Sequence, residues 1–218
     1  MSGGRLLILG ASGHGKVVGD CARAMGRWSE ILFFDQRWPD LTGCGPWRVI
    51  GRGEDLVDAL LPGDQFFVAI GNSATRLTWL RHLRGCGISL ATVIHPYSQI
   101  SSSVVVGEGG IVVAGAVVNI DACLGIGCII NTAASVDHDC QLGDGVHVCP
   151  GAHLAGDVRV GESSWIGIGA AVRQGIRIGA AVMVGAGAVV VADIADGLTV
   201  AGVPARPVIK NNELELKC

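Results

Sequence analysis

The stretch SVDHDCQLGDGVHV, residues 135–148, carries the repeat that decides the fold. Val136, Leu142 and Val148 stand six positions apart, and the series continues in both directions, from Ile94 to Val190. Every one of its seventeen positions is Ile, Leu or Val. An α-helix with about 3.6 residues per turn does not keep every sixth residue on one face, whereas a coil of short parallel strands does. The spacing therefore predicts a parallel β-coil in this part of the chain.

The residues between the aliphatic positions indicate how the coil closes. Glycine often follows the aliphatic residue, where a turn with positive φ can form. Small or medium residues recur four positions after it: Ala116, Ala122, Cys128, Ala134, Cys140, Ala152, Ser164, Ala170 and Ala188. We expect a triangular prism in which three hexapeptides make one coil and successive coils stack about 4.8 Å apart. Narrow corners explain why aromatic residues make up only 5% of the chain.

Such a coil places residues three hexapeptides apart directly over one another. Gly156 is then expected above His138, and Trp165 above His147. A neighbouring column is formed by Pro150, Ile168 and Ala186. We expect a long, thin ligand to fit along this strip of backbone and small apolar groups.

Before residue 94 the pattern changes to alternating strands and helices. Strands are predicted at 5–10, 31–35 and 65–71, and helices at 14–26, 53–61 and 73–86. This alternation is typical of a small parallel α/β domain. His95-Pro96 marks the joint, and the closing stretch AGVPARPVIKNNELELKC loses the six-residue period. We expect that stretch to cover the strand edges at the open end of the coil.

Composition and charge exclude several classes of partner. The net charge is −3 and no lysine or arginine cluster is present, which disfavours nucleic acid and anionic membranes. No apolar run reaches the roughly 18 residues that cross a bilayer, and no signal peptide precedes the first strand. The eight cysteines form no Cys-x-x-Cys pair, so we expect a reduced, cytoplasmic protein without a thiolate zinc site.

Three loops of the α/β domain are expected to meet at one edge of its sheet. GASGHGK, Gly10 to Lys16, lies between a strand and a helix, where backbone N–H groups favour a phosphate. A plain tight turn is the alternative, because the pattern is not the dinucleotide fingerprint. Asp35 ends the second strand and could accept hydrogen bonds from a ribose, or serve as an ordinary cap. Gly71 and Asn72 end the third strand, and together the loops predict a small-molecule site.

His138 stands between two aspartates, Asp137 and Asp139. A neighbouring carboxylate raises the basicity of an imidazole and can fix its tautomer, which suits a general base. The alternatives are a hydrogen-bonded surface histidine, or a zinc site shared with His147 and His153. The histidine spacing does not match the trihistidine pattern of the metal-dependent enzymes built on such coils, so we expect no metal. A non-catalytic trimerisation rod is the remaining alternative.

Several motifs in combination resemble one bacterial enzyme family over nearly the whole chain. These are GASGHGKVV, AIGN, the hexapeptide coil, DHDC and the closing AGVPARPV. The chain resembles the acetyl-CoA-dependent nucleotide-sugar N-acetyltransferases of the bacillosamine, viosamine and perosamine type, close to the sialic acid O-acetyltransferases. The resemblance implies a Rossmann-like nucleotide-sugar-binding domain in residues 1–94. It also implies a left-handed parallel β-helix in 95–218 that binds acetyl-CoA, and a homotrimer with active sites between subunits.

The resemblance also implies roles for individual residues. His138 matches the catalytic base, Asp139 its acidic support, and the Gly156 N–H a donor to the oxyanion. The nucleotide sugar would contact Ser12, Gly13, His14, Asp35, Gln36 and Gly71. Acetyl-CoA would be held by His147, Ile168 and Ala186. Relatives usually carry Glu at the position of Asp139 and an acid at that of Gln36.

The implied reaction is acetyl transfer in glycan biosynthesis. The 4-amino group of a nucleotide-linked 4-amino-4,6-dideoxy sugar attacks the acetyl-CoA thioester while neutral His138 takes the proton. O-acetylation of a sialic acid or another hydroxyl acceptor is the alternative. The choice among UDP, dTDP and GDP stays open.

Overall fold

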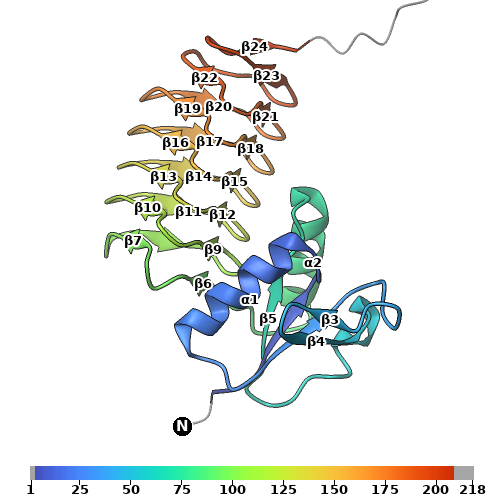
Figure 1. Cartoon of the computed structure of the whole chain (residues 1–218). Coiled ribbons are helices and arrows are strands. Elements are labelled where there is room, and N and C mark those ends of the chain that lie inside the picture. The colour runs from blue at the N-terminus through green and yellow to red at the C-terminus, as the bar shows by residue number, and fades with distance from the viewer. Residues whose placement is uncertain (1–2, 209–218) are drawn as a thin grey trace, which may run out of the picture.

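The computed structural model describes residues 3–208 and consists of an α/β unit followed by a tall coil (Figure 1). The last ten residues of the predicted closing segment, 209–218, lie outside the described residues. No helix among the described residues is long and apolar enough to cross a bilayer.

The α/β unit is built on a five-stranded sheet in the order β3-β4-β2-β1-β5. The elements in chain order are β1 Leu6–Leu9, α1 Gly13–Met25, β2 Ile31–Phe34, β3 Gly43–Cys44, β4 Trp47–Gly51, η1 Gly53–Leu56, β5 Gln65–Val68 and α2 Ser73–Gly85. Strands β1, β2, β4 and β5 are parallel, and β3 pairs antiparallel with β4. The three predicted strands and the helices at 14–26 and 73–86 are confirmed.

Two parts of this unit differ from the sequence prediction. The helix expected at 53–61 is wrong: a single 3₁₀ turn, η1, is followed by irregular backbone. A helix of nine residues is too short to be stable without strong packing, and Pro62 stops its extension. The β3–β4 hairpin was not predicted, because β3 has only two residues and its turn at Gly45-Pro46 joins strands without clear alternation.

The coil is a left-handed parallel β-helix with three faces. The first face contains β6 Val93–Ile94, β9 Ile111–Val112, β12 Ile129–Ile130, β15 His147–Val148, β18 Trp165–Ile166, β21 Met183–Val184, β23 Thr199–Ala201 and β24 Arg206–Pro207. The second contains β7 Gln99–Ile100, β10 Val117–Val118, β13 Ser135–Val136, β16 His153–Leu154, β19 Ala171–Val172 and β22 Val189–Val190. The third contains β8 Val105–Val106, β11 Cys123–Leu124, β14 Gln141–Leu142, β17 Arg159–Val160 and β20 Arg177–Ile178.

The predicted register holds through most of the coil. Val136 pairs with Leu154 and His147 with Trp165, which are partners three hexapeptides apart. The inward aliphatic and small residues together form one continuous buried core. The top coil is shorter, since Val184 pairs with Val200, sixteen positions on. There β24 pairs antiparallel with β23 and ends the first face, as expected for a closing segment.

The two helices attach the α/β unit to the lower coils. Val18 and Cys21 of α1 share a buried cluster with Ile111 and Ile129 of the first face. Helix α2 lies over the corner turns of the coil, where Leu77 closely approaches Gly145. Figure 1 shows both helices beside the lower end of the coil. The carboxyl edge of the small sheet is therefore placed next to the first face.

Candidate active site

A pocket of about 260 Å³ opens at the carboxyl edge of the small sheet. It is lined by Leu9, Gly10, Ser12, Asp35, Gln36, Ala69, Ile70, Gly71 and Trp79. Four of the six residues predicted to bind the nucleotide sugar therefore meet here. Of the other two, Gly13 begins α1 with open space where a side chain would stand, and His14 lies beside His147 instead. Trp79 lies in the middle of α2, and no motif in the sequence singled it out.

The glycine loop has both structural and ligand-binding features. Gly10 has φ +107°, and a Cβ on it would stand 2.8 Å from the carbonyl oxygen of Ala69. A Cβ on Gly15 would overlap the Gly10 carbonyl oxygen, so these two glycines are required by packing alone. Ser12 is the N-cap of α1, yet its side chain makes no capping hydrogen bond. Its hydroxyl and the first N–H groups of α1 therefore remain available at the pocket.

Asp35 is fixed by its own neighbours. Its Oδ2 accepts a hydrogen bond from the Ala11 N–H at 2.8 Å, and its Oδ1 accepts one from Arg37 Nε at 2.8 Å. The Arg37 guanidinium holds the pKa of Asp35 at about 2, well below its usual range. Gln36 donates to Glu54 Oε2 at 3.2 Å, which places a carboxylate beside Gln36. Arg37 and Glu54 were missed because their roles depend on the fold around β2.

His14 and His147 lie side by side where α1 meets the coil. Their ring centroids are 6.4 Å apart, and the His147 ring is 4.1 Å from that of Trp165. Burial, followed by the charge of Arg76, lowers the pKa of His14 to about 4 and that of His147 to about 3. Both imidazoles are therefore neutral at pH 7. His147 Nε2 lies 3.2 Å from Asn131 Nδ2.

One nitrogen of each ring stays unpaired. His14 Nε2 and His147 Nδ1 are buried and have no hydrogen-bond partner within residues 3–208. By the family resemblance, His14 was expected to contact the nucleotide sugar and His147 to hold acetyl-CoA. The structure brings the two together at one junction, and this could not be read from positions so far apart in the chain.

His138 occupies a corner of the prism, between β13 and β14. Its Nδ1 lies 2.7 Å from Asp139 Oδ2, and its side chain is 55% exposed. The hydrogen bond to Asp139 is the main cause that raises the pKa of His138 above 6.5. Asp137 is used differently: its Oδ1 accepts from Asn119 Nδ2 and from the His138 N–H.

Gly156 lies directly beside the His138 ring. A Cβ on Gly156 would overlap the imidazole, so this position must be glycine for the ring to lie there. The predicted column of His138 and Gly156 is thereby confirmed. The Gly156 N–H has no hydrogen-bond partner among the described residues. Within the same residues no group of three His, Cys, Asp or Glu side chains could hold a metal ion.

The prism separates the predicted site residues into two groups. His147 lies on the first face, and Ile168 and Ala186 stand in the corner column that follows it, where Gly187 N–H donates to the Ile168 carbonyl oxygen at 2.7 Å. His138 and Gly156 occupy the corner between the second and third faces, opposite the first face. The buried aliphatic core lies between these two groups. Within one chain, His138 therefore does not meet His147 or the pocket at Asp35.

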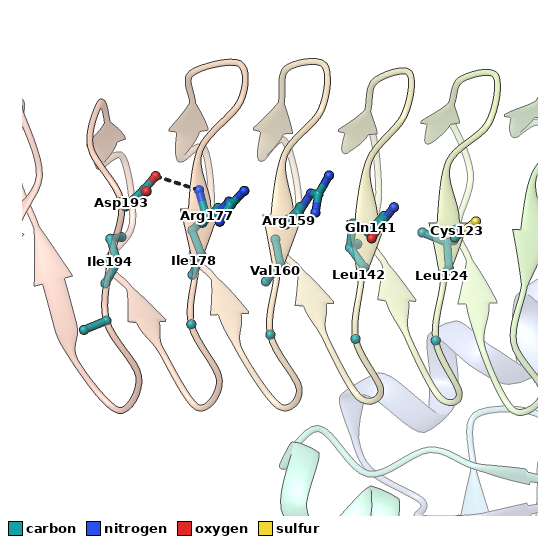
Figure 2. Close-up of a pocket in the computed structure, with 15 residues that line it drawn as sticks. Cys123, Leu124, Gln141, Leu142, Arg159, Val160, Arg177, Ile178, Asp193 and Ile194 are labelled. Atoms are coloured by element: carbon teal, nitrogen blue, oxygen red, sulfur yellow. Dashed lines mark hydrogen bonds between the residues drawn. The ribbon is translucent and has the colours of Figure 1, made fainter.

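A groove of about 1060 Å³ runs along the third face, and none of the predicted catalytic or ligand-binding residues lines it. Figure 2 shows Gln141, Arg159 and Arg177 as a row on neighbouring strands. The backbone N–H of Arg177 donates to Asp193 Oδ1 at 2.8 Å. None of the residues that line this groove was predicted to bind a ligand.

Comparison with known proteins identifies the family. The family model described as the PglD N-terminal domain matches residues 5–83. UDP-N-acetylbacillosamine N-acetyltransferase of Bacillus subtilis (strain 168) is 38% identical over 109 residues, which are 49% of this chain and 50% of that protein. The match thus spans about half the length of this curated relative.

Two solved structures are similar over almost the entire chain. The acetyltransferase domain of PglB from Neisseria gonorrhoeae FA1090 is 45% identical with a TM-score of 0.91, covering 94% of this chain and 99% of that chain. PerB from Caulobacter crescentus, solved in complex with CoA and GDP-perosamine, is 40% identical with a TM-score of 0.89, covering 94% and 98%. The chain belongs to the PglD-like family of hexapeptide-repeat sugar N-acetyltransferases.

Proposed function

We propose that this protein transfers the acetyl group of acetyl-CoA to the 4-amino group of a nucleotide-linked 4-amino-4,6-dideoxy sugar. The observation that carries the proposal is the exposed His138 imidazole, hydrogen-bonded through Nδ1 to Asp139 and stacked over Gly156. The relatives support the substrate class, since one is named for an acetylated amino sugar and another was solved with CoA and GDP-perosamine. Structures of that second enzyme also include variants in which one histidine is replaced by Asn or Ala.

The hydrogen bond to Asp139 assigns the tautomer of the base. A carboxylate only accepts, so Nδ1 carries the proton and the lone pair of Nε2 is free. The sugar nitrogen attacks the thioester carbonyl carbon, and its proton passes to Nε2. As the amide C–N bond forms, the C–S bond breaks and the sulfur leaves as the CoA thiolate, which regains a proton from the imidazolium or from water. The unpaired Gly156 N–H lies beside the ring and suits the oxyanion of the intermediate.

We assign the nucleotide sugar to residues 1–94 and acetyl-CoA to 95–218. The pocket at Ser12, Asp35, Gln36 and Gly71 supports the first assignment, and the exposed column of Ile168 and Ala186 beside His147 supports the second. Because the prism separates His138 from both, the complete site needs a second copy of the chain. A homotrimer with the site between neighbouring subunits meets this need.

The substrate class is tested by measuring release of CoA thiol with UDP-, dTDP- and GDP-linked 4-amino sugars. We expect turnover with at least one of them and little with the matched 4-hydroxy sugars or with sialic acid. Turnover confined to hydroxyl acceptors would contradict N-acetylation in favour of O-acetylation. Absence of both turnover and acetyl-CoA binding would indicate a scaffold.

The base is tested with His138→Ala. We expect kcat to fall by about 10²–10⁴, with little change in the KM for acetyl-CoA, because the ring acts only in proton transfer. His153→Ala is the matched control, since His153 is an exposed coil histidine that contacts Ser135 at 2.8 Å. Unaltered turnover in His138→Ala would remove the histidine from the mechanism.

A further inference from the structure

Arg76 of α2 is fully buried, and its whole guanidinium is engaged. Its Nε donates to the Gly127 carbonyl oxygen at 2.9 Å, and its Nη2 to the Gly145 carbonyl oxygen at 2.8 Å. Its Nη1 donates to the carbonyl oxygens of Ile70 and Gly71 at 2.7 and 2.9 Å. A weaker contact of 3.3 Å joins Nη2 to Ser73 Oγ.

These partners belong to two separate parts of the molecule. Ile70 and Gly71 line the pocket at the carboxyl edge of the small sheet. Gly127 and Gly145 are corner turns of the coil, both with positive φ, and Gly145 stands two residues before His147. One side chain thus connects the pocket loop with the strand that carries His147.

Burying the Arg76 guanidinium without a carboxylate partner costs free energy, so holding the fold together does not by itself account for this contact. No carboxylate among residues 3–208 forms an ion pair with Arg76, and burial lowers its pKa to about 10. Apolar side chains such as Leu77 and Leu80 already pack α2 on the coil without burying a charge. What a guanidinium adds is a rigid planar fork with five donors, which holds several carbonyl groups at fixed distances.

We propose that Arg76 is a positioning residue that fixes the nucleotide-sugar pocket relative to the coil. The proposal rests on the proposed function, because it assumes that the sugar binds at Gly71. The hydrogen bonds of Arg76 act as a clamp between the pocket loop and the coil. A sugar held by the pocket loop is thereby presented at a constant height along the coil, beside His147. Without the clamp, the loop and the corner turns are free to shift, so the pocket must be ordered anew when the sugar binds, and this ordering weakens the binding of the nucleotide sugar.

The test compares Arg76→Lys and Arg76→Met with two control variants. Arg81→Met removes another link between α2 and the coil, an exposed ion pair of Arg81 with Glu162 at 3.0 Å that does not touch the pocket. Arg5→Met removes another arginine, which is paired with Asp64 inside the α/β unit. Lysine is not a substitute for the fork of Arg76, since an ammonium retains the charge but loses the planar geometry.

We expect both Arg76 variants to raise the KM for the nucleotide sugar by about tenfold or more, with the KM for acetyl-CoA unchanged within about twofold. The Arg5 variant is expected to lower Tm without changing either KM, and the Arg81 variant to change little. A folded Arg76 variant with wild-type KM for the nucleotide sugar would overturn the proposal. If no nucleotide sugar is turned over by the wild-type protein, the proposed function fails, and this outcome is distinct from that of the variants.

Hydrogen exchange on the wild-type protein tests the same idea without a substitution. Binding of the nucleotide sugar is expected to protect amides at residues 70–73 and also those of the corner turns at Gly127 and Gly145. This holds whether or not the Arg76 variants fold. Protection confined to the α/β unit would contradict the clamp.

Discussion

At the scale of single residues, the hydrogen bond to Asp139 is the main cause of the raised pKa of His138. The structure brings the Asp139 carboxylate within 2.7 Å of the ring. The backbone of Asp139 has φ +60°, a left-handed turn that Asp tolerates better than most residues. The corner turn therefore places the short Asp139 side chain against the neighbouring His138 ring.

Replacing Asp139 by Asn is expected to move the acid limb of the pH–rate profile to lower pH. The base works only when neutral, and Asp139 raises the pKa of His138, so wild-type activity falls as pH decreases through that raised pKa. Without the carboxylate the pKa returns toward its ordinary value of 6.5. The profile of kcat/KM between about pH 5 and 9 measures the shift. Asp121→Asn, one coil below in the same column, is the control, and an unmoved limb in Asp139→Asn would exclude this role.

The buried histidine His147 predicts a loss of stability in acid. Its pKa of about 3 in the folded protein lies below 6.5, so the unfolded chain binds a proton first as pH falls. The contribution of His147 to the free energy of unfolding is fully present above about pH 6.5 and declines as pH falls toward the folded pKa. Between pH 7 and pH 5 this loss is about 2 kcal/mol.

Urea denaturation at both pH values, with His147→Gln, checks this expectation. The variant is expected to be less stable at pH 7 but to lose less of its free energy of unfolding on acidification. His153→Gln, an exposed histidine, is the control and should follow the wild-type protein. An equal loss in His147→Gln and wild type would show that the burial of this ring does not set the acid response.

At the scale of elements, the hexapeptide determines the coil through two kinds of small residue. Ser164 is fully buried and donates through Oγ to the Gly179 carbonyl oxygen at 2.7 Å, and the thiols of Cys128 and Cys140 make the corresponding contact fifteen residues on. These side chains fill the corners and satisfy backbone groups there. Glycines after the aliphatic residue form the second kind, because the next coil approaches them closely.

Gly161→Ala is expected to destabilise the coil. A Cβ at this position would overlap the backbone of Gly179 and Ala180 in the next coil, and backbone does not give way as a side chain does. We expect a loss of about 1–3 kcal/mol or more in the free energy of unfolding by chemical denaturation. Gly85→Ala is the control, since a Cβ there meets nothing within 4 Å. Equal stability of the two variants would mean that neighbouring coils are less tightly stacked than this contact indicates.

At the scale of the whole molecule, the prism decides which residues share a site. Its core stands between the corner with His138 and the face with His147, so no rotation of side chains joins them. Under the proposed function, the exposed His138 and the pocket at Gly71 would act together only across a subunit boundary.

Mixed oligomers test this arrangement. His138→Ala removes the base, and Gly71→Trp fills the sugar pocket at a position where a Cβ meets nothing within 4 Å. Each variant alone is expected to be nearly inactive. Unfolding and refolding the two together should restore about a quarter of the wild-type activity, the fraction of subunit pairs in which one chain supplies His138 and its neighbour the pocket. Activity no higher than the sum of the separate variants would place the site within one chain.

Much of this architecture follows from the sequence by itself. A six-residue period has one compact solution, so the coil, its register and the stacking of His138 over Gly156 were all accessible from spacing. The glycine loop with Ser12, Asp35 and Gly71 were also accessible, because parallel strands end at the same side of a sheet, whereas Gln36 followed only from the family resemblance. By contrast, the hairpin and the 3₁₀ turn after β4 depend on local packing that short segments do not encode strongly.

Only the tertiary structure decided the contacts between the two parts of the chain. His14 beside His147, and Arg76 between Gly71 and Gly145, join residues separated by long stretches of the chain. Their pairing depends on where α1 and α2 rest on the coil, and this is set by the summed packing of many apolar side chains. A repeat in sequence specifies distances along one element, whereas the docking of two elements has no period from which it could be read.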